Sequence, residues 1–379
     1  MGRVNRASLA IGVLLLTAGL VPARSQQAPP ASRPAAPCAP VVNGLHFICG
    51  IVDPEDLVHI PDSRWLVISG YDPGGGLLGG SGLKLVDARA KSFSVLYTAA
   101  GAQVRSDQRT GAACADPPPS NLMTHGLYLR STSRTGRYVL YAVTHTPRET
   151  VEMFSLDATG DAPQIAWSGC LPMPAGLRAN GVATFSDGTV LVTVPNAPDQ
   201  RGPDGAGRGV VLEWKPGSTG FQPVPGTALA SNNGIEISKD EKEFFVVAFG
   251  EATIYAFSRA NPAAPPRSAK APGFVPDNLR WSGDRLIGTG PMYDEPACGG
   301  TRREAAAIGA GRGPGGGCNR GYVAAALDPV AMTWKVLAYA EPNPQMGIIS
   351  AGVVVDDTLW IGAALSPGLA YRPLPRPGN

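Results

Sequence analysis

The stretch Asn232-Asn233-Gly234-Ile235 is one of six polar clusters in this chain, each directly before a short, apolar, strand-like run. The other five are Pro54-Glu55-Asp56-Leu57, Thr124-His125-Gly126-Leu127, Ala179-Asn180-Gly181-Val182, Pro276-Asp277-Asn278-Leu279 and Ser350-Ala351-Gly352-Val353. They lie roughly 45 to 75 residues apart, about the length of a four-stranded propeller blade with its loops. If each cluster opens the innermost strand of a blade, all six face one central shaft from the same end. We therefore predict an all-β fold: a six-bladed β-propeller with four-stranded antiparallel blades.

The segments that follow the clusters repeat one order of elements. Residues 182–185 form an apolar run, residues 186–188 a Ser-Asp-Gly turn, and residues 190–193 a second run. The innermost hairpin of a blade requires this order of strand, tight turn and strand. A β-sandwich is the competing architecture, but it does not predict one polar cluster at the start of each unit. The last unit is short of strands, and we expect a run near residues 44–49 to complete it, so that an N-terminal strand closes the ring.

Length and composition fit a single large domain. The chain has 379 residues, of which 44% are apolar, and it contains 48 glycines and 37 prolines. All-β folds of this length often form one unit, and these residues suit short strands joined by turns. The net charge is only +2, and no basic stripe with interleaved aromatics occurs, so nothing indicates nucleic acid or an anionic membrane as a partner. We expect one propeller domain over residues 43–376, and a monomer.

The N-terminal segment has the pattern of a secretion signal. Arg3 and Arg6 precede an apolar run, residues 7–20, which is followed by the small-x-small sequence Ala23-Arg24-Ser25. A membrane anchor is the alternative, but it needs about 20 apolar residues, more than this run provides. We expect residues 1–25 to be a signal peptide and residues 26–42, rich in Pro and Ala, to be a disordered tether. The protein would then be exported to the periplasm or the extracellular space, without stable membrane insertion.

The six cysteines fit disulfide bonds, because an even count in an exported protein favours them over metal or redox roles. No Cys-x-x-Cys pair is present, which argues against a zinc site. We favour pairing Cys298 with Cys318, Cys114 with Cys170, and Cys38 with Cys49. The connectivity stays open, since six cysteines allow fifteen pairings.

The candidate functional side chains lie at the ends of the predicted strands. In a blade, the inner strand starts at the face where its hairpin partner ends, so both positions line one pocket mouth. The starts supply Glu55, Asp56, His125, Asn180, Asn233, Asp277 and Asn278. The partner ends supply Tyr71, His145, Asn196, Phe249, Met292 and Tyr293.

The side chains at the starts suit calcium. They include three carboxylates and three amides but no thiol, and calcium takes six to eight oxygen ligands in flexible geometry. Zinc or copper would call for clusters of His or Cys. Taken singly, each Asn or Asp is also explained as a turn former at a strand end. Their equivalent positions in successive units favour the ion.

These residues resemble the calcium-dependent propeller lactonases and arylesterases of the paraoxonase family, within the wider group that includes gluconolactonase and regucalcin. The resemblance covers about residues 44–374, patchily between the motifs. It rests on the clusters around Glu55, His125, Asn180, Asn233 and Asp277, on residues 141–147 (Tyr-Ala-Val-Thr-His-Thr-Pro) with 150–154, and on residues 350–362.

The resemblance implies roles for particular residues. Glu55, Asn180, Asn233, Asp277 and Asn278 match the ligands of the family's catalytic calcium. His125 and His145 match its histidine dyad. Asp56 and the backbone carbonyl of Leu127 match part of a second, structural calcium site. This chain has Gly181 where the family has a further carboxylate, which puts the second ion in doubt.

The activity that follows is hydrolysis of lactones or carboxylic (aryl) esters. Calcium would polarise the carbonyl, His125 would act as general base on water, and His145 would orient it or relay the proton. Water activated by Asp277 or Glu55 is the fallback if His125 is dispensable. A non-catalytic secreted propeller that binds a ligand or a protein, and a metal-free enzyme similar to strictosidine synthase, are the alternatives.

An insertion interrupts the fifth unit between its second and third strands. Residues 299–317 lie between Cys298 and Cys318 and include Arg302, Arg303 and Arg312. They start close to Met292 and Tyr293, so they could cover the pocket as a lid or form a surface loop. Aryl esters, acyl-homoserine-type lactones and sugar lactones all fit a pocket of mixed apolar and polar character.

Overall fold

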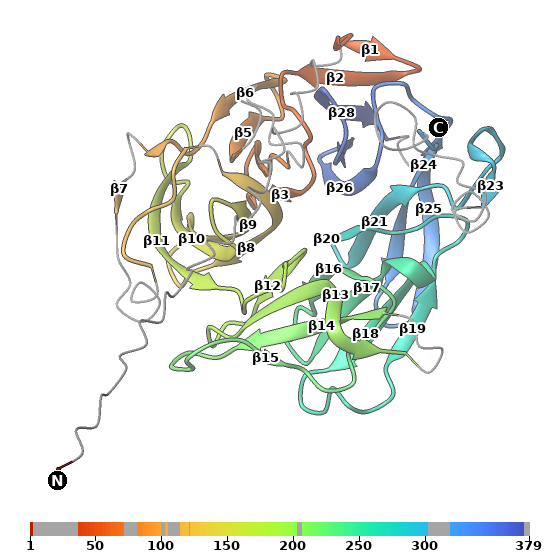
Figure 1. The fold of residues 1–379 in the computed structure, drawn as a ribbon. Helices are drawn as coiled ribbons and strands as arrows, with labels where there is room; N and C mark the ends of the chain where they lie inside the picture. Colours follow the sequence, from red (N-terminus) through yellow and green to blue (C-terminus); the bar gives the residue numbers. More distant parts are fainter. Residues whose placement is uncertain are drawn as a thin grey trace.

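The computed structural model describes residues 1–2, 37–71, 82–99, 103–104, 114–120, 122–202, 207–301 and 319–374. Within these ranges the chain forms strands and two short 3₁₀ helices, η3 (Phe249–Glu251) and η4 (Pro296–Cys298). The sheets follow one another in sequence order around a central axis (Figure 1). The predicted six-bladed β-propeller with four-stranded antiparallel blades is confirmed.

The first three blades come directly from consecutive strands. The first blade contains β3 (Leu57–His59), β4 (Trp65–Ile68), β5 (Lys84–Asp87) and β6 (Ser92–Val95). The second contains β8 (Met123–Ser131), β9 (Arg137–Thr146), β10 (Thr150–Asp157) and β11 (Gln164–Pro172), with β7 (Gln103–Val104) parallel to β11. The third contains β12 (Val182–Thr184), β13 (Val190–Arg201), β14 (Gly207–Trp214) and β15 (Gln222–Pro223).

The remaining blades include the insertion and the closure of the ring. The fourth blade contains β16 (Asn232–Ile237), β17 (Glu243–Ala248), β18 (Thr253–Ser258) and β19 (Arg267–Lys270). The fifth contains β20 (Asn278–Ser282), β21 (Arg285–Pro291), β24 (Tyr322–Asp328) and β25 (Thr333–Ala340), with the small pair β22 (Asp294–Glu295) and β23 (Gly300–Thr301) after β21. The sixth contains β26 (Ile349–Val355), β27 (Thr358–Ala363), β28 (Gly368–Pro373), β2 (Leu45–Cys49) and β1 (Val41–Val42).

The N-terminal strand closes the ring, as the sequence indicated. Strand β2 pairs antiparallel with β28, with His46 opposite Tyr371. The first and last described strands of the propeller therefore belong to one sheet. The disulfide bond Cys38–Cys49, with Cα atoms 5.7 Å apart, ties the segment before β1 to the end of β2. Strand β1 starts two residues before the domain boundary that the sequence suggested.

The apolar patterns decide which strands lie inside. Residues of the inner and second strands are buried on both faces, because neighbouring blades pack against each side of a sheet; β12 and β17 are nearly continuous apolar runs for this reason. The outermost strand β6 is exposed throughout. Seven clusters of buried side chains hold the blades together among the described residues.

Two of the three favoured disulfides lie within the described ranges. The structure contains Cys38–Cys49 and Cys114–Cys170, which are the pairs favoured from the sequence. The third pair includes Cys318, which lies outside the described residues, as do most of the predicted signal peptide and tether and residues 302–318 of the insertion. In the described part of the chain, no helix is long and apolar enough to cross a membrane.

The inner strands contact one another around the shaft, each touching the next from β3 to β26 and back to β3 (Figure 1). At the polar clusters this approach becomes a backbone hydrogen bond. The amide of Gly126 donates to the carbonyl of Asn180 (3.0 Å), and the amide of Gly234 donates to that of Asp277 (2.9 Å). A Cβ atom on Gly234 would lie 2.5 Å from the carbonyl oxygen of Asp277. Neither glycine has a positive φ, so close approach rather than a turn accounts for them.

This contact predicts that Gly234→Ala destabilises the propeller. A methyl group there pushes against the backbone of Asp277 and Asn278, and such overpacking costs about 1–3 kcal/mol. Urea denaturation followed by circular dichroism measures the change. Gly220→Ala is the matched control, because nothing lies within 4 Å of its added Cβ, and it should leave stability nearly unchanged. Equal effects of the two substitutions would contradict the close-approach explanation.

Candidate functional site

The inner-strand openings carry their polar side chains to one end of the shaft. Glu55, Asn180 and Asp277 lie just before β3, β12 and β20, whereas His125 and Asn233 lie inside β8 and β16. Irregular register in the β8–β9 pair between Thr124 and Leu127, and in the β16–β17 pair between Asn232 and Ile235, brackets the last two residues. Bulges of this kind bend the strand and re-aim a side chain, often beside functional sites.

The polar side chains from four blades meet there. The Nδ2 atom of Asn278 donates to Oε1 of Glu55 at 3.0 Å, although the two residues are 223 positions apart in the sequence. The same Glu55 oxygen lies 3.6 Å from Nε2 of His125. The Nδ2 atom of Asn180 lies 3.3 Å from that histidine nitrogen. Ser350, in the one cluster without an expected role, donates its hydroxyl to the backbone carbonyl of Glu55.

Asn233 and Asp277 are held beside this group by backbone contacts. The carbonyl of Asn233 accepts the hydroxyl of Thr193, and the carbonyl of Asp277 accepts the amide of Gly234. All five expected ligand residues are buried, with exposed fractions from 2% to 8%. The structure therefore brings the expected ligands to neighbouring strand openings.

Three oxygen atoms of this set lack a hydrogen-bond partner among the described residues: Oε2 of Glu55, Oδ1 of Asn180 and Oδ1 of Asn233. Buried polar atoms are almost always hydrogen-bonded, because leaving one unpaired costs about 1–3 kcal/mol. Carboxylate and amide oxygens are the ligands that calcium prefers. The unpaired oxygens therefore fit a hard cation at this position.

The same donor set does not fit zinc. Among the described residues, no three His, Cys, Asp or Glu side chains gather closely enough to hold a metal ion. The expected set contains only two carboxylates, Glu55 and Asp277, and its other members are asparagine amides. Amide oxygens are common calcium ligands but not zinc ligands.

The two histidines lie in direct contact next to these oxygens. The Nδ1 atom of His125 and the Nε2 atom of His145 are 2.8 Å apart. The ring of Tyr71 lies over that of His125, with centroids 4.4 Å apart, and meets the ring of His145 edge-on at 6.0 Å. Burial lowers the pKa of His145, although the hydrogen bond that its ring donates to Glu149 opposes the shift. Burial thus favours the neutral form of this imidazole.

Glu149 is a member of the site that the sequence analysis missed. Its carboxylate oxygens lie 2.8 and 3.0 Å from Nδ1 of His145, and its Oε1 also pairs with Nε of Arg178 at 3.0 Å. Glu149 follows His145 by four residues, in the turn between β9 and β10. A carboxylate in the turn directly after a strand-end histidine was the available signal, because the tight turn folds it back onto the ring.

A cavity of about 720 Å³ opens beside this pair. Its apolar lining comes from residues such as Met123, Met173 and Leu177, and its polar lining from His145, Glu149 and Arg178. The cavity can therefore accommodate a small organic molecule next to His145.

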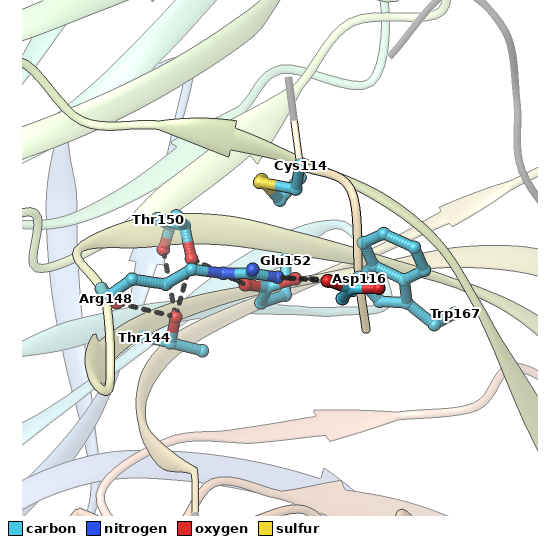
Figure 2. The surroundings of a disulfide bond; sticks show 8 residues. Cys114, Asp116, Thr144, Arg148, Thr150, Glu152 and Trp167 are labelled. Carbon is cyan, nitrogen blue, oxygen red and sulfur yellow. Dashed lines mark hydrogen bonds and ion pairs between the residues drawn. A yellow bond between two sulfur atoms is a disulfide. The ribbon is translucent and has the colours of Figure 1, made fainter. Parts of the chain in front are cut away.

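A buried network holds the turn that carries Glu149. The carboxylate of Glu152 accepts hydrogen bonds from Nε of Arg148 (2.8 Å), the hydroxyl of Thr150 (2.7 Å) and the indole of Trp167 (2.8 Å). Figure 2 shows these side chains next to Cys114, whose disulfide partner Cys170 lies opposite Glu152 in the sheet. Arg148 also donates to the carbonyl of Asp116 at 3.0 Å. The network thus joins the turn to the core of the second blade.

Removing the carboxylate of Glu152 should destabilise the protein. Glu152→Ala removes the acceptor shared by Arg148, Thr150 and the indole of Trp167, and leaving a buried donor without its partner costs about 1–3 kcal/mol. Urea denaturation measures this loss. Glu152→Gln retains an acceptor oxygen and should be less harmful, whereas equal stability of all three proteins would contradict a supporting role for the network.

The expected second calcium site holds a protein cation instead. The buried guanidinium of Arg280 donates to Oδ2 of Asp56, to the carbonyl of Leu127 (2.9 Å) and to the carbonyl of Leu57 (2.8 Å). Asp56 and Leu127 are the two residues proposed as ligands of that ion. The residues present therefore do not fit a second calcium, because their oxygens already bind the positive charge of Arg280.

Burial raises the pKa values of the two carboxyl groups near Arg280. It raises the pKa of Asp56 to about 6, while the charge of Arg280 opposes the shift. It also raises the pKa of Glu236 to about 7, again with Arg280 acting in the opposite direction. Arg280 is thus the counter-charge for two buried carboxyl groups in the shaft.

Losing this counter-charge should weaken the fold strongly. Arg280→Met leaves Asp56 buried beside no cation, and such a change typically costs about 3–5 kcal/mol. The double variant Asp56→Asn/Arg280→Met removes both charges and should recover part of the loss. Urea denaturation of the three proteins tests this, and a single variant as stable as the wild type would be inconsistent with the buried ion pair.

The other expected pocket residues have different surroundings. Phe249 and Met292 pack against the apolar clusters of the fourth and fifth blades. Asn196 is exposed, and Tyr293 accepts a hydrogen bond from Arg320 through its carbonyl. Tyr71 contacts the ring of His125. The expected lid residues Arg302, Arg303 and Arg312 lie outside the described residues.

Comparisons with known proteins show resemblance in architecture. No family model matches the chain, and no curated protein matches it. Solved structures that do match include a gluconolactonase from Xanthomonas campestris, at 18% identity and a TM-score of 0.47 over 90% of this chain and 99% of that one. Regucalcin, a calcium-binding protein from Agrobacterium tumefaciens, matches at 11% identity and 0.46, over 86% of this chain and 92% of that one.

A third match is the structure of a nidogen/laminin complex, at 11% identity and a TM-score of 0.42, covering 79% of this chain and 82% of that one. The matching structures thus include a gluconolactonase, a calcium-binding protein and a protein–protein complex. The function of this chain has to be inferred from its own residues.

Proposed function

We propose that this protein is a calcium-dependent hydrolase of lactones or carboxylic esters. The observation that carries the proposal is the set of buried, unpaired oxygens of Glu55, Asn180 and Asn233 beside the contacting pair His125 and His145. Glu55, Asn180, Asn233, Asp277 and Asn278 would hold the ion. A propeller that only binds a ligand would not need the paired histidines beside these oxygens.

The ion, when bound, would polarise the carbonyl group and stabilise the negative charge that develops on its oxygen. His125 then acts as general base: its Nε2 takes a proton from water as the water oxygen bonds to the carbonyl carbon. The same proton passes to the leaving oxygen as the acyl–oxygen bond breaks. A lactone yields a hydroxy acid, and an ester yields an acid and an alcohol.

His145 and Tyr71 support this step without touching the reacting atoms. His145 accepts or donates at the Nδ1 atom of His125, and Tyr71 covers the ring of His125. Both contacts fix the direction in which the Nε2 atom of His125 points. The apolar part of the neighbouring cavity accommodates the aryl or acyl group of the substrate.

Export is part of the proposal. The two disulfides are compatible with an oxidising compartment, and the N-terminal segment has the pattern of a signal peptide. The partner is a small ester or lactone, and the protein would act as a monomer.

Chelation tests the metal. Hydrolysis of a panel of small lactones and aryl esters should fall to background after EDTA treatment and return with calcium, while Glu55→Gln should weaken calcium binding measured by isothermal titration calorimetry. Activity that persists without calcium would favour a metal-free enzyme instead.

Substitution tests the base. His125→Gln should lower kcat by about 10²- to 10⁴-fold, the usual contribution of general base catalysis. His46→Gln, in the closing strand β2, serves as the control and should retain wild-type kcat. Full turnover by His125→Gln would remove this residue from the mechanism, and calcium binding without any hydrolysis would indicate a binding protein.

A further inference from the structure

We propose that Glu149 is a positioning residue: it sets the tautomers of both histidines so that Nε2 of His125 carries a lone pair. The inference rests on the proposed function, in which that atom accepts a proton from water. Glu149 itself touches neither the expected ligands nor the Nε2 atom of His125.

The tautomers of His145 and His125 can be assigned in turn, starting from the carboxylate of Glu149. A carboxylate can only accept hydrogen bonds, and a neutral imidazole has one donor and one acceptor nitrogen. The Nδ1 atom of His145 lies 2.8 Å from Glu149 and must therefore carry the proton. The Nε2 atom of His145 is then the acceptor, and it faces Nδ1 of His125 at 2.8 Å. His125 accordingly holds its proton on Nδ1 and a lone pair on Nε2.

The other end of the chain agrees with this assignment. The Nδ2 atom of Asn180 lies 3.3 Å from Nε2 of His125, nearer than the Oε1 atom of Glu55 at 3.6 Å, and an amide NH₂ group needs an acceptor there. In the proposed function, a water takes the place of this donor at the lone pair. The Oδ1 atom of Asn180 is the buried oxygen without a partner. The amide of Asn180 thus presents its nitrogen to the histidine, while its buried oxygen stays without a hydrogen-bond partner.

The distance between the two histidines does not by itself show which ring donates the hydrogen bond. The same 2.8 Å distance would allow His145 to donate from Nε2, which would put the proton of His125 on its Nε2 atom. His125 could not then accept a proton from water. A group that accepts at Nδ1 of His145 removes this alternative, and Glu149 is that group.

Glu149 is itself held from two sides. Nε of Arg178 pairs with its Oε1 atom at 3.0 Å. The residue that precedes it, Arg148, donates a hydrogen bond to Glu152 in the network of Figure 2. The side chain of His145 is 2% exposed, whereas that of Glu149 is 30% exposed. The carboxylate therefore stands at the rim of the cavity and points inward to a buried ring.

The ring nitrogens of histidine report the tautomer directly in ¹⁵N nuclear magnetic resonance. The chain has only four histidines, so the signals of ¹⁵N-histidine-labelled protein can be assigned with single substitutions. At about pH 8, above the ordinary histidine pKa, we expect both His125 and His145 to carry the proton on Nδ1. The spectra are recorded without calcium, so that this result does not depend on activity.

Two substitutions of Glu149 separate its contributions. Glu149→Ala should allow the Nε2–H form of both rings and lower kcat by about 10- to 100-fold, as for other carboxylates that orient a functional histidine, with little change in KM. Glu149→Gln retains an oxygen that can accept from His145, so it should keep the tautomers and more of kcat. Glu341→Ala, at an exposed position, is the control and should behave as wild type. Circular dichroism checks that each variant is folded.

The outcomes are distinct from those of the proposed function. An Nε2–H form of His145 in the wild type would overturn the inference even if the protein is an active lactonase. Glu149→Ala with unchanged tautomers, or with shifted tautomers and wild-type kcat, would overturn it as well. If no substrate is hydrolysed, the proposed function fails, and the tautomers still show whether Glu149 directs the two rings.

Discussion

The close approach of neighbouring inner strands is the constraint on which the rest of the structure depends. The amide of Gly126 bonds to the carbonyl of Asn180, and the amide of Gly234 to that of Asp277. Each bond joins one blade to the next at a residue whose side chain faces the shaft. A side chain on either glycine would separate the strands. The same backbone contacts that pack the blades therefore also set the distances between the polar side chains of the site.

The shaft contains two polar regions that differ in how their oxygen atoms are paired. In the inner region, Arg280 supplies a permanent positive charge to Asp56 and Glu236. At the opening, Glu55, Asn180 and Asn233 keep buried oxygens unpaired. A buried ion pair within the protein contributes chiefly when its hydrogen bonds are complete, as around Arg280. Unpaired oxygens in contrast suit an exchangeable cation, which supports the calcium site that we propose at the opening.

The sequence predicted much of the fold and less of the site. The six clusters, the repeated hairpins and the closing strand near residue 47 follow from periodicity and turn chemistry, which are local properties. Arg280 was missed because it stands between two apolar residues of β20, and the oxygens of Asp56 and Leu127 that it binds are more than 150 residues away. Glu149 was missed because its role depends on how one turn folds back onto His145. The bulge around His125 also decides a side-chain direction that strand alternation alone does not give. Phe249 and Met292 were expected at the pocket on strand position alone, and the structure shows that both are partly buried against apolar clusters of the fourth and fifth blades.

The direct contact between Glu55 and Asn278 joins the first blade to the fifth across the opening of the shaft. Between these two blades in the ring lies the sixth, which is completed only when β2 pairs with β28. The oxygens of the opening therefore reach their final spacing only in the closed ring. A ligand that binds the folded state but not the unfolded state increases the free energy of unfolding of the whole domain. A cation bound at this opening would stabilise the closed ring. Its affinity would therefore depend on the pairing of β2 with β28.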